Sequence, residues 1–282
     1  MRLPEELNRA IEKEISRPGS LPLRKAASDI SDRYRGSEGG PIALSSGGRI
    51  AYLATRLPSI YAAVSSVLME LRKRLPGTSP RSLLDLGAGP GTAVWAAVEC
   101  FEDLEKITLI ERDIEFSRAG KRIAAHSPVE SVSSAEWVTA NLTANWTVAP
   151  QELVVMSYAL GELDSANRGA VVERAWEKTA RVLAIIEPGS VRGFQTVLAA
   201  RSELISMGAH VIAPCPHEQE CPLAGGDWCH FSARIERTSW QRRLKSGTLP
   251  YEDEKFSYVL VTRDPAETAA ARIIRRPHKA KG

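Results

Sequence analysis

The stretch Leu83-Leu-Asp-Leu-Gly-Ala-Gly-Pro-Gly-Thr92 decides the fold. A short apolar run leads into glycines at every second position, and a helical pattern follows. Gly87 and Gly89 let the backbone turn sharply and lie against a ligand where a Cβ atom would clash. A helix that begins near Gly91 presents free N–H groups to a carboxylate or a phosphate. The stretch therefore predicts a nucleotide-binding turn, with Asp85 and Ala88 among its residues.

Short apolar runs alternate with helical patterns after this turn. The strands are predicted at 82–86, 107–111, 136–139, 152–157 and 182–187, and the helices at 91–100, 114–125, 165–180 and 191–207. Alternation of this kind predicts a doubly wound α/β fold, with a parallel sheet covered on both faces. Two later strands, 210–213 and 255–263, are expected to close the sheet as an antiparallel pair, which fits a methyltransferase better than a dehydrogenase.

The rest of the chain divides around this core. Residues 1–77 are expected to be helical, with a long helix over 49–75 that is interrupted near Pro58. Residues 78–213 form the predicted ligand-binding domain. A cysteine-rich insertion with a basic helix follows over 214–250, and a final strand with a basic tail over 251–282.

Polar residues at the strand ends complete the predicted site. Glu111 ends the second strand, where a carboxylate can accept hydrogen bonds from both ribose hydroxyls. Asn141 follows the third strand and Ser157 ends the fourth. Asp-x-Gly-x-Gly-x-Gly with an acidic second strand resembles motif I of the class I S-adenosylmethionine (SAM) methyltransferases. SAM is the predicted ligand, with NAD or a vestigial empty pocket as alternatives, and no catalytic residue is assigned.

Three cysteines predict a metal site near the C-terminal end. Cys215, Cys221 and Cys229 fall within fifteen residues on proline-rich backbone. Such a segment buries little apolar surface, so a bound metal would order it. Zinc would accept three cysteines with His217 or His230. An iron–sulfur cluster prefers four thiolates, and the spacing slightly favours it. Three unligated thiols remain the alternative.

Charge and hydropathy indicate the partners. Residues 231–282 carry a balance of +6, which leaves −3 on the first 230 residues. A basic end on a near-neutral body points to a polyanion, with nucleic acid as the first candidate and a solvated surface as the alternative. A helix from Ala233 to Gly247 is expected to bring several basic side chains to one surface: Arg234, Arg237, Arg242, Arg243 and Lys245, joined later by Arg275 and Arg276. Trp240 is expected either to stack a base or to lie in the core.

No apolar run approaches the ~20 residues that span a bilayer, and the N-terminus has no signal-peptide pattern. A cytoplasmic protein with reduced thiols is therefore expected.

The whole pattern resembles the small-ribosomal-subunit assembly factors of mitochondria and their bacterial homologues, a methyltransferase-like family. The resemblance runs from about residue 40 onward and rests on 85–91, 157–162, Glu187-Pro-Gly-Ser190, the three cysteine motifs and 251–258. It implies a SAM-binding fold, a [4Fe–4S] cluster on the three cysteines and action on small-subunit rRNA. The family's fourth cysteine follows the basic Arg-Arg-Pro segment and has no counterpart in this sequence.

The resemblance leaves two readings of the function open. The leading expectation is a SAM-dependent methyltransferase that acts on rRNA, and the alternative is a non-catalytic, metal-stabilised RNA-binding assembly factor with a vestigial SAM pocket. A small-molecule methyltransferase is a weaker third reading. A monomer is expected, in the cytoplasm of a bacterium or in the mitochondria of a eukaryote.

Overall fold

The computed structural model describes residues 1–17, 23–35, 44–223, 227–245 and 248–273. Three helices precede the sheet: α1 (Glu5–Ile15), α2 (Leu23–Arg35) and α3 (Ser46–Arg74). The next elements alternate: β1 (Ser82–Leu86), α4 (Thr92–Cys100), β2 (Lys106–Glu111), α5 (Ile114–Ala124), α6 (Glu130–Ser133), β3 (Glu136–Thr139), β4 (Gln151–Ser157), the 3-10 turn η1 (Leu160–Glu162), α7 (Ser165–Glu177), β5 (Thr179–Pro188) and α8 (Val191–Ser206). The described chain ends with β6 (His210–Ala213), β7 (Phe231–Glu236), α9 (Ser239–Leu244) and β8 (Tyr251–Thr262).

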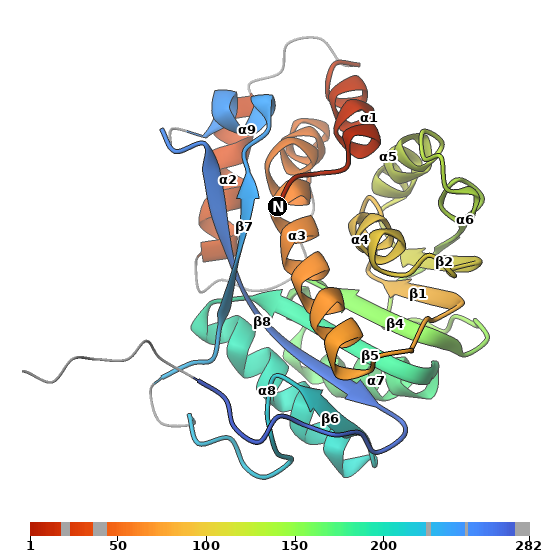
Figure 1. Cartoon of the computed structure of the whole chain (residues 1–282). Coiled ribbons are helices and arrows are strands. Elements are labelled where there is room, and N and C mark those ends of the chain that lie inside the picture. Colours follow the sequence, from red (N-terminus) through yellow and green to blue (C-terminus); the bar gives the residue numbers. More distant parts are fainter. Residues whose placement is uncertain (18–22, 36–43, 224–226, 246–247, 274–282) are drawn as a thin grey trace, which may run out of the picture.

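One sheet joins all of these strands in the order β3-β2-β1-β4-β5-β8-β6, and β7 pairs with β8 (Figure 1). The first five strands of this order are parallel. β8 runs antiparallel to β5, β6 and β7. This confirms the prediction of a parallel sheet closed by antiparallel strands, and the strand order is that of a class I SAM-methyltransferase-like α/β fold.

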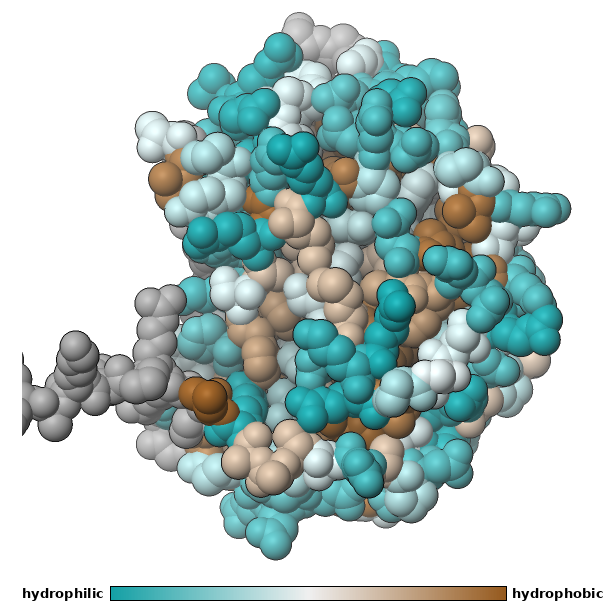
Figure 2. Space-filling model, viewed as in Figure 1, coloured by the Kyte–Doolittle hydropathy of each residue, from teal (hydrophilic) through white to brown (hydrophobic). Residues whose placement is uncertain are grey.

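Helices cover both faces of the sheet. One hydrophobic core joins α1, α3, α4 and α5 to the first face, and a second joins α7 and α8 to the other. Apolar residues on α1, including Leu7 and Ile11, belong to the first core. The helices α1 and α3 therefore share a core with the sheet. In the described part of the chain no helix combines the length and apolar character needed to cross a membrane, and the face seen in Figure 2 is mostly hydrophilic.

The helix α3 runs without a break through Pro58, so the predicted interruption is wrong. A proline inside a helix costs roughly 3 kcal/mol. Nearly every residue from Ile50 to Leu68 is buried, and burial of a single large apolar side chain contributes about 1.5–3 kcal/mol. Packing of this helix against the sheet therefore outweighs the local cost.

The basic helix predicted from Ala233 is also wrong over its first half. Residues Phe231–Glu236 form β7, in which Ala233 and Ile235 are buried and alternate with the exposed Ser232, Arg234 and Glu236. This period of two fits pairing with the first half of β8. Only α9 is helical, and a capping box between Thr238 and Gln241 begins it. The last strand also begins earlier than predicted, at Tyr251 rather than at Lys255.

Candidate functional site

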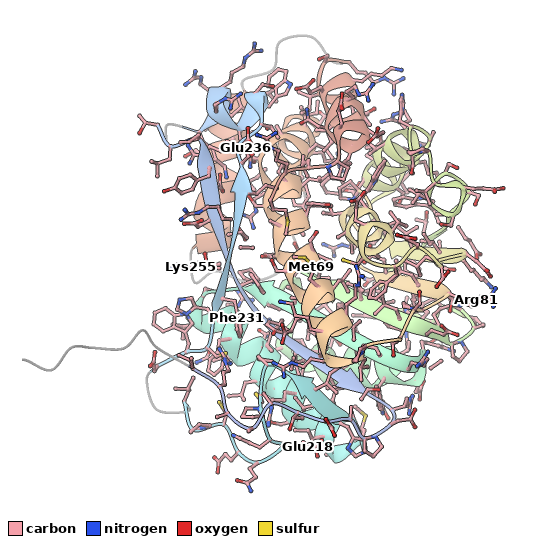
Figure 3. The ribbon with its side chains drawn as sticks, in the orientation of Figure 1. Met69, Arg81, Glu218, Phe231, Glu236 and Lys255 are labelled. Carbon is pink, nitrogen blue, oxygen red and sulfur yellow. The ribbon has the colours of Figure 1, made fainter. Side chains whose placement is uncertain are left out.

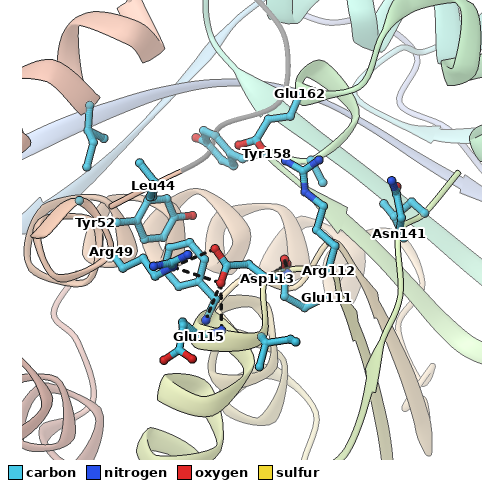
Figure 4. A pocket seen from close by; sticks show the side chains of 18 of the residues that line it. Leu44, Arg49, Tyr52, Glu111, Arg112, Asp113, Glu115, Asn141, Tyr158 and Glu162 are labelled. Carbon is cyan, nitrogen blue, oxygen red and sulfur yellow. Dashed lines mark hydrogen bonds and ion pairs between the residues drawn. The ribbon is translucent and has the colours of Figure 1, made fainter. Parts of the chain in front are cut away.

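A cavity of about 800 Å³ lies at the carboxyl ends of the parallel strands. The turn after β1, the end of β2 and the segments after β3 and β4 form one side of it, and α2, α3 and the start of α5 form the other (Figure 4). β1 lies between β2 and β4, where the strand order reverses, and ligands of open α/β sheets bind at such a point. The volume lies within the usual range of roughly 300–1,000 Å³ for ligand pockets.

The glycine turn is open toward this cavity at Gly89. Gly89 has a φ of 55°, and apart from Gly89 and its two chain neighbours no residue has an atom within 4 Å of the position that a Cβ would take. At Gly87 the same position would lie 2.5 Å from the Cβ of Ala159, so no side chain fits there. α4 begins directly after Gly91, whose φ is 81°. The turn thus brings unobstructed backbone to the cavity at Gly89, and the nine-residue helix α4 begins two residues beyond Gly89's neighbour Pro90.

Glu111 braces this turn. One of its carboxylate oxygens accepts the N–H of Gly89 at 2.7 Å, and the other accepts the N–H of Asp113 at 2.7 Å. Burial raises the pKa of Glu111 above its usual range, and these two backbone hydrogen bonds oppose the shift. The predicted ribose acceptor therefore also stabilises the turn, and each of its oxygens can accept a second hydrogen bond. Glu111 lines the cavity.

Asp85 is the least satisfied charged group near the turn. It is 1% exposed, and neither carboxylate oxygen has a hydrogen-bond partner among the described residues. Burial, and secondarily the charge of Glu111, raise the pKa of Asp85 to about 8. A buried orphan carboxyl of this kind is stabilised by a cationic group that comes close to it.

Five of the eight predicted ligand residues line the cavity: Gly87, Gly89, Glu111, Asn141 and Ser157. The other three, Asp85, Ala88 and Gly91, do not line it and lie in or beside the turn.

Tyr158 lies in the cavity wall in a strained conformation. Its φ of 56° is the one positive value among non-glycine residues in the described segments, and such backbone costs about 1–3 kcal/mol. Its hydroxyl donates to Glu254 of β8 at 2.9 Å. Glu254 also accepts two hydrogen bonds from the buried Arg56 of α3, at 2.8 and 3.2 Å. Burial, and next the charge of Glu254, hold the pKa of Tyr158 well above its usual range. The Arg56–Glu254 pair therefore fixes a tyrosine in the cavity wall.

Glu187, at the end of β5, fixes the loop after β4 through hydrogen bonds. Its carboxylate accepts the N–H of Gly161 at 3.1 Å, and burial raises its pKa to about 7. Arg168 and Arg192 both donate to the carbonyl oxygen of Gly161. These contacts fix the segment that carries Glu162, which lines the cavity.

The N-terminal helices supply cavity residues that the sequence does not reveal. Arg49 of α3 donates to both carboxylate oxygens of Asp113, at 2.9 and 3.1 Å. Tyr52 meets Phe116 edge-on, with 5.1 Å between the ring centroids. No local pattern marks these residues, because their partners lie on α5 or just before it.

The three predicted metal-binding cysteines line one cavity of about 340 Å³ between α8 and the last strand. His217 lines it too, whereas His230 instead stacks on Trp228 with 5.4 Å between the centroids. The cysteine segment can be located in Figure 3 from two labelled residues: Glu218 lies between Cys215 and Cys221 in the sequence, and Phe231 follows Cys229 by two positions.

Buried polar contacts hold this segment in place. Arg201 of α8, 4% exposed, donates to the carbonyl oxygens of His217 and Gln219 at 2.8 and 3.0 Å. Ser257 of β8 donates to the carbonyl oxygen of Cys229 at 2.6 Å. Within the described ranges, no three His, Cys, Asp or Glu side chains are close enough together to hold a single metal ion.

The predicted RNA-binding residues are in different surroundings. Arg234 forms an exposed ion pair with Asp253 at 2.7 Å. Arg237 and Lys245 both reach the half-buried Glu252. Arg242 and Arg243 lie exposed on α9, where Arg243 covers the ring of the half-buried Trp240 at 5.4 Å. Arg275 and Arg276 lie outside the described residues.

The family model described as "Mitochondrial small ribosomal subunit Rsm22" matches residues 47–282. The chain belongs to the Rsm22 family. The match covers nearly all of α3, the whole sheet and the cysteine segment. The cysteine cavity lies inside the matched region, whereas the larger cavity also has lining residues on α2 and just before α3, outside it.

Among curated relatives, this Rsm22-family chain is 30% identical over 237 residues to the human "Ribosome assembly protein METTL17, mitochondrial", covering 78% of the chain and 50% of the relative. It is 26% identical over 274 residues to the "Rsm22-cox11 tandem protein 2, mitochondrial" of Schizosaccharomyces pombe, covering 89% of the chain and 35% of that protein. The chain thus spans half the length or less of these relatives. Among solved structures, the SAM-bound magnesium protoporphyrin IX methyltransferase of Synechocystis PCC 6803 is similar with a TM-score of 0.49 and 13% identity, covering 88% of this chain and all of that one.

Proposed function

We propose that this chain is a SAM-binding, methyltransferase-like ribosome-assembly protein that acts on small-subunit rRNA. The observation that carries the proposal is the cavity at the strand-order reversal, which meets the open glycine turn and the end of β2. Membership of the Rsm22 family and the name of the human relative supply the ribosomal part.

The cavity residues fit SAM. Gly89 leaves the ligand side of the turn open, and a Cβ there would intrude on that space. Glu111 would accept the ribose hydroxyls, and Asn141 would contact the adenine. Asp85 offers a buried, unpaired carboxyl beside the turn, which suits a ligand that carries positive charge. SAM would supply an electrophilic methyl group, while the chain would hold it, orient it and exclude water.

The acceptor side favours an assembly factor that does not turn over. Tyr158 is engaged by Glu254, and Glu187 with two arginines fixes the loop after β4. General-base catalysis of methyl transfer would need a group free to bind the acceptor, and Tyr158 and the loop after β4 are instead engaged in contacts within the chain. We infer that SAM binding serves assembly, with rRNA methylation as the alternative.

We propose further that Cys215, Cys221 and Cys229 hold an iron–sulfur cluster. Sulfur ligands of one zinc ion lie about 4 Å apart, because each Zn–S bond is about 2.3 Å long and the geometry is tetrahedral. In a [4Fe–4S] cubane each iron binds one cysteine thiolate. The cysteine sulfurs therefore lie farther apart than around one zinc ion, and they surround the volume that the cluster fills. Three thiols around about 340 Å³, without a compact ion site, fit that arrangement. His217, which lines the same cavity, is a candidate for a fourth ligand, and zinc remains the alternative.

The RNA surface is proposed to centre on Arg242 and Arg243. Both are exposed, while Arg234, Arg237 and Lys245 are each paired with a carboxylate. Phosphates attract exposed arginines regardless of sequence. We place the protein in mitochondria if its source is eukaryotic, since its relatives are named as mitochondrial, and in the cytoplasm of a bacterium, as a monomer.

Titration calorimetry with SAM tests the proposal. One equivalent should bind, and Gly89→Val should abolish binding. Gly208→Val is the matched control, since Gly208 also has a positive φ and open space but follows α8 and lines neither cavity. Crosslinking in cells should recover small-subunit rRNA with the chain. If SAM gives no heat of binding, and its demethylated product does not compete with SAM for the chain, SAM binding is refuted. RNA binding would then be the only part of the proposed function left.

A further inference from the structure

The cysteine cavity is closed by a part of the chain that no motif marks. After β8 the described chain continues without a helix or strand, and Ala270, Ala271 and Arg272 of this segment line the cavity. Thr268 donates its hydroxyl to the carbonyl oxygen of Pro216 at 3.1 Å. The segment therefore lies across the cysteines and is tied at one point to the loop that carries the first of them.

Arg272 makes the second tie, and it does so at a cysteine. Its guanidinium donates to the sulfur of Cys229, with 2.9 Å between Nη1 and Sγ. The same guanidinium lies over the ring of Phe231, 4.3 Å from the ring centroid. In the part of the chain that the structure describes, Arg272 is paired with no carboxylate. The half-buried cation is thus directed at a thiol rather than at an acid.

The stacking explains why an arginine suits this position. A planar guanidinium can lie flat on Phe231 and still direct N–H groups sideways to the sulfur. Ser257 fixes the backbone of Cys229 from the opposite direction by donating to its carbonyl oxygen. Cys229 is therefore held at both its backbone and its sulfur, before any metal is considered.

We propose that Arg272 is the positioning residue of the cysteine cavity. It holds the sulfur of Cys229 in place, and it fixes the segment 266–272 as the outer wall of the cavity. Toward a bound cluster, which rests on the function proposed above, it supplies a hydrogen bond to a ligand sulfur and a positive charge. Both effects stabilise the reduced and more negative state of a cluster, so they raise its reduction potential.

The test compares Arg272→Gln with Arg272→Lys and with the matched control Arg263→Gln. Arg263 also stacks on an aromatic ring, Trp176 at 3.9 Å, and donates to the carbonyl oxygen of Thr179 at 2.9 Å, but it touches no cysteine. Hydrogen exchange of the metal-free full chain is the first readout. Arg272→Gln should speed exchange in 228–231 and 266–272 roughly tenfold or more, because a charge-assisted hydrogen bond is lost. Arg263→Gln should leave both segments unchanged.

Anaerobic reconstitution is the second readout. Arg272→Gln should lower the reduction potential of the cluster and weaken its retention against a chelator by about tenfold or more. Arg272→Lys keeps the charge and should restore part of both, which a purely structural role would not produce. Arg263→Gln should match the parent.

The outcomes separate the two claims. Unchanged exchange in Arg272→Gln overturns the positioning role. Faster exchange in a protein that takes up no cluster supports the positioning role and removes the proposed cluster. A cluster whose potential and retention are the same in Arg272→Gln and the parent overturns the role toward the cluster.

Discussion

Replacing Glu254 with alanine should destabilise the fold far more than the same change at its neighbour Asp253. Glu254 is 7% exposed and accepts hydrogen bonds from Arg56 and Tyr158, so its loss removes the carboxylate that is paired with a buried guanidinium. Breaking a buried ion pair by removing one partner costs about 3–5 kcal/mol. Asp253 is exposed and pairs only with the exposed Arg234, so its loss should have little effect.

Urea unfolding followed by circular dichroism measures this difference. With a slope of about 3 kcal/mol per molar urea, the midpoint of Glu254→Ala should fall by roughly 1–2 M. Tyr158→Phe should fall between the two variants, because it removes one hydrogen bond to a charged acceptor, worth about 1.5–3 kcal/mol, and leaves the Arg56–Glu254 pair intact. If Glu254→Ala is no less stable than Asp253→Ala, the pair does not hold Tyr158 and the wall of the cavity is not built as described.

The remaining predictions concern ligand, pH and RNA. Glu111→Ala should weaken SAM binding roughly ten- to a hundredfold in calorimetry, since about 1.5–3 kcal/mol is lost with a charged acceptor; an unchanged affinity would place the ribose elsewhere. The pKa of Asp85 is about 8 in the folded chain against an ordinary 3.8, so the unfolded state ionises first and stability falls as the pH rises from about 4 to 8. The difference in melting temperature between Asp85→Asn and the parent should grow in favour of the variant from about pH 4 to 8 and level off above that range. A difference that does not change with pH would contradict the raised pKa of Asp85. Replacing Arg242 and Arg243 with alanine should lower the log–log salt slope of RNA binding by roughly 0.7–0.9 for each lost phosphate contact, while an unchanged slope would make them a solvated face.

The fold was predictable because its signals are local. The run from Leu83 to Thr92 contains the strand, the turn and the helix start within ten residues, and each strand of the parallel sheet is a short apolar run of its own. The family resemblance is confirmed by the match over residues 47–282.

The secondary-structure predictions fail where contacts with residues distant in the sequence determine the local structure. Ala233 and Ile235 alternate with charged residues in a way that an arginine-rich helix also allows, and only the pairing of β7 with β8 settles the choice. Burial of α3 overrides the proline at its centre. Arg56 and Glu254 lie 198 positions apart, and Cys229 and Arg272 lie 43 apart, so no spacing rule joins them.

Photochemical crosslinking of labelled SAM to the full chain, followed by peptide mapping, tests the central claim most directly. The account predicts one label per chain, in peptides that contain Gly89, Glu111, Asn141 or Tyr158, because these residues line the same cavity. Excess demethylated product should compete the label away, and Gly89→Val should abolish it while Gly208→Val retains it. Label confined to other peptides, or label that the product does not displace, would contradict the account.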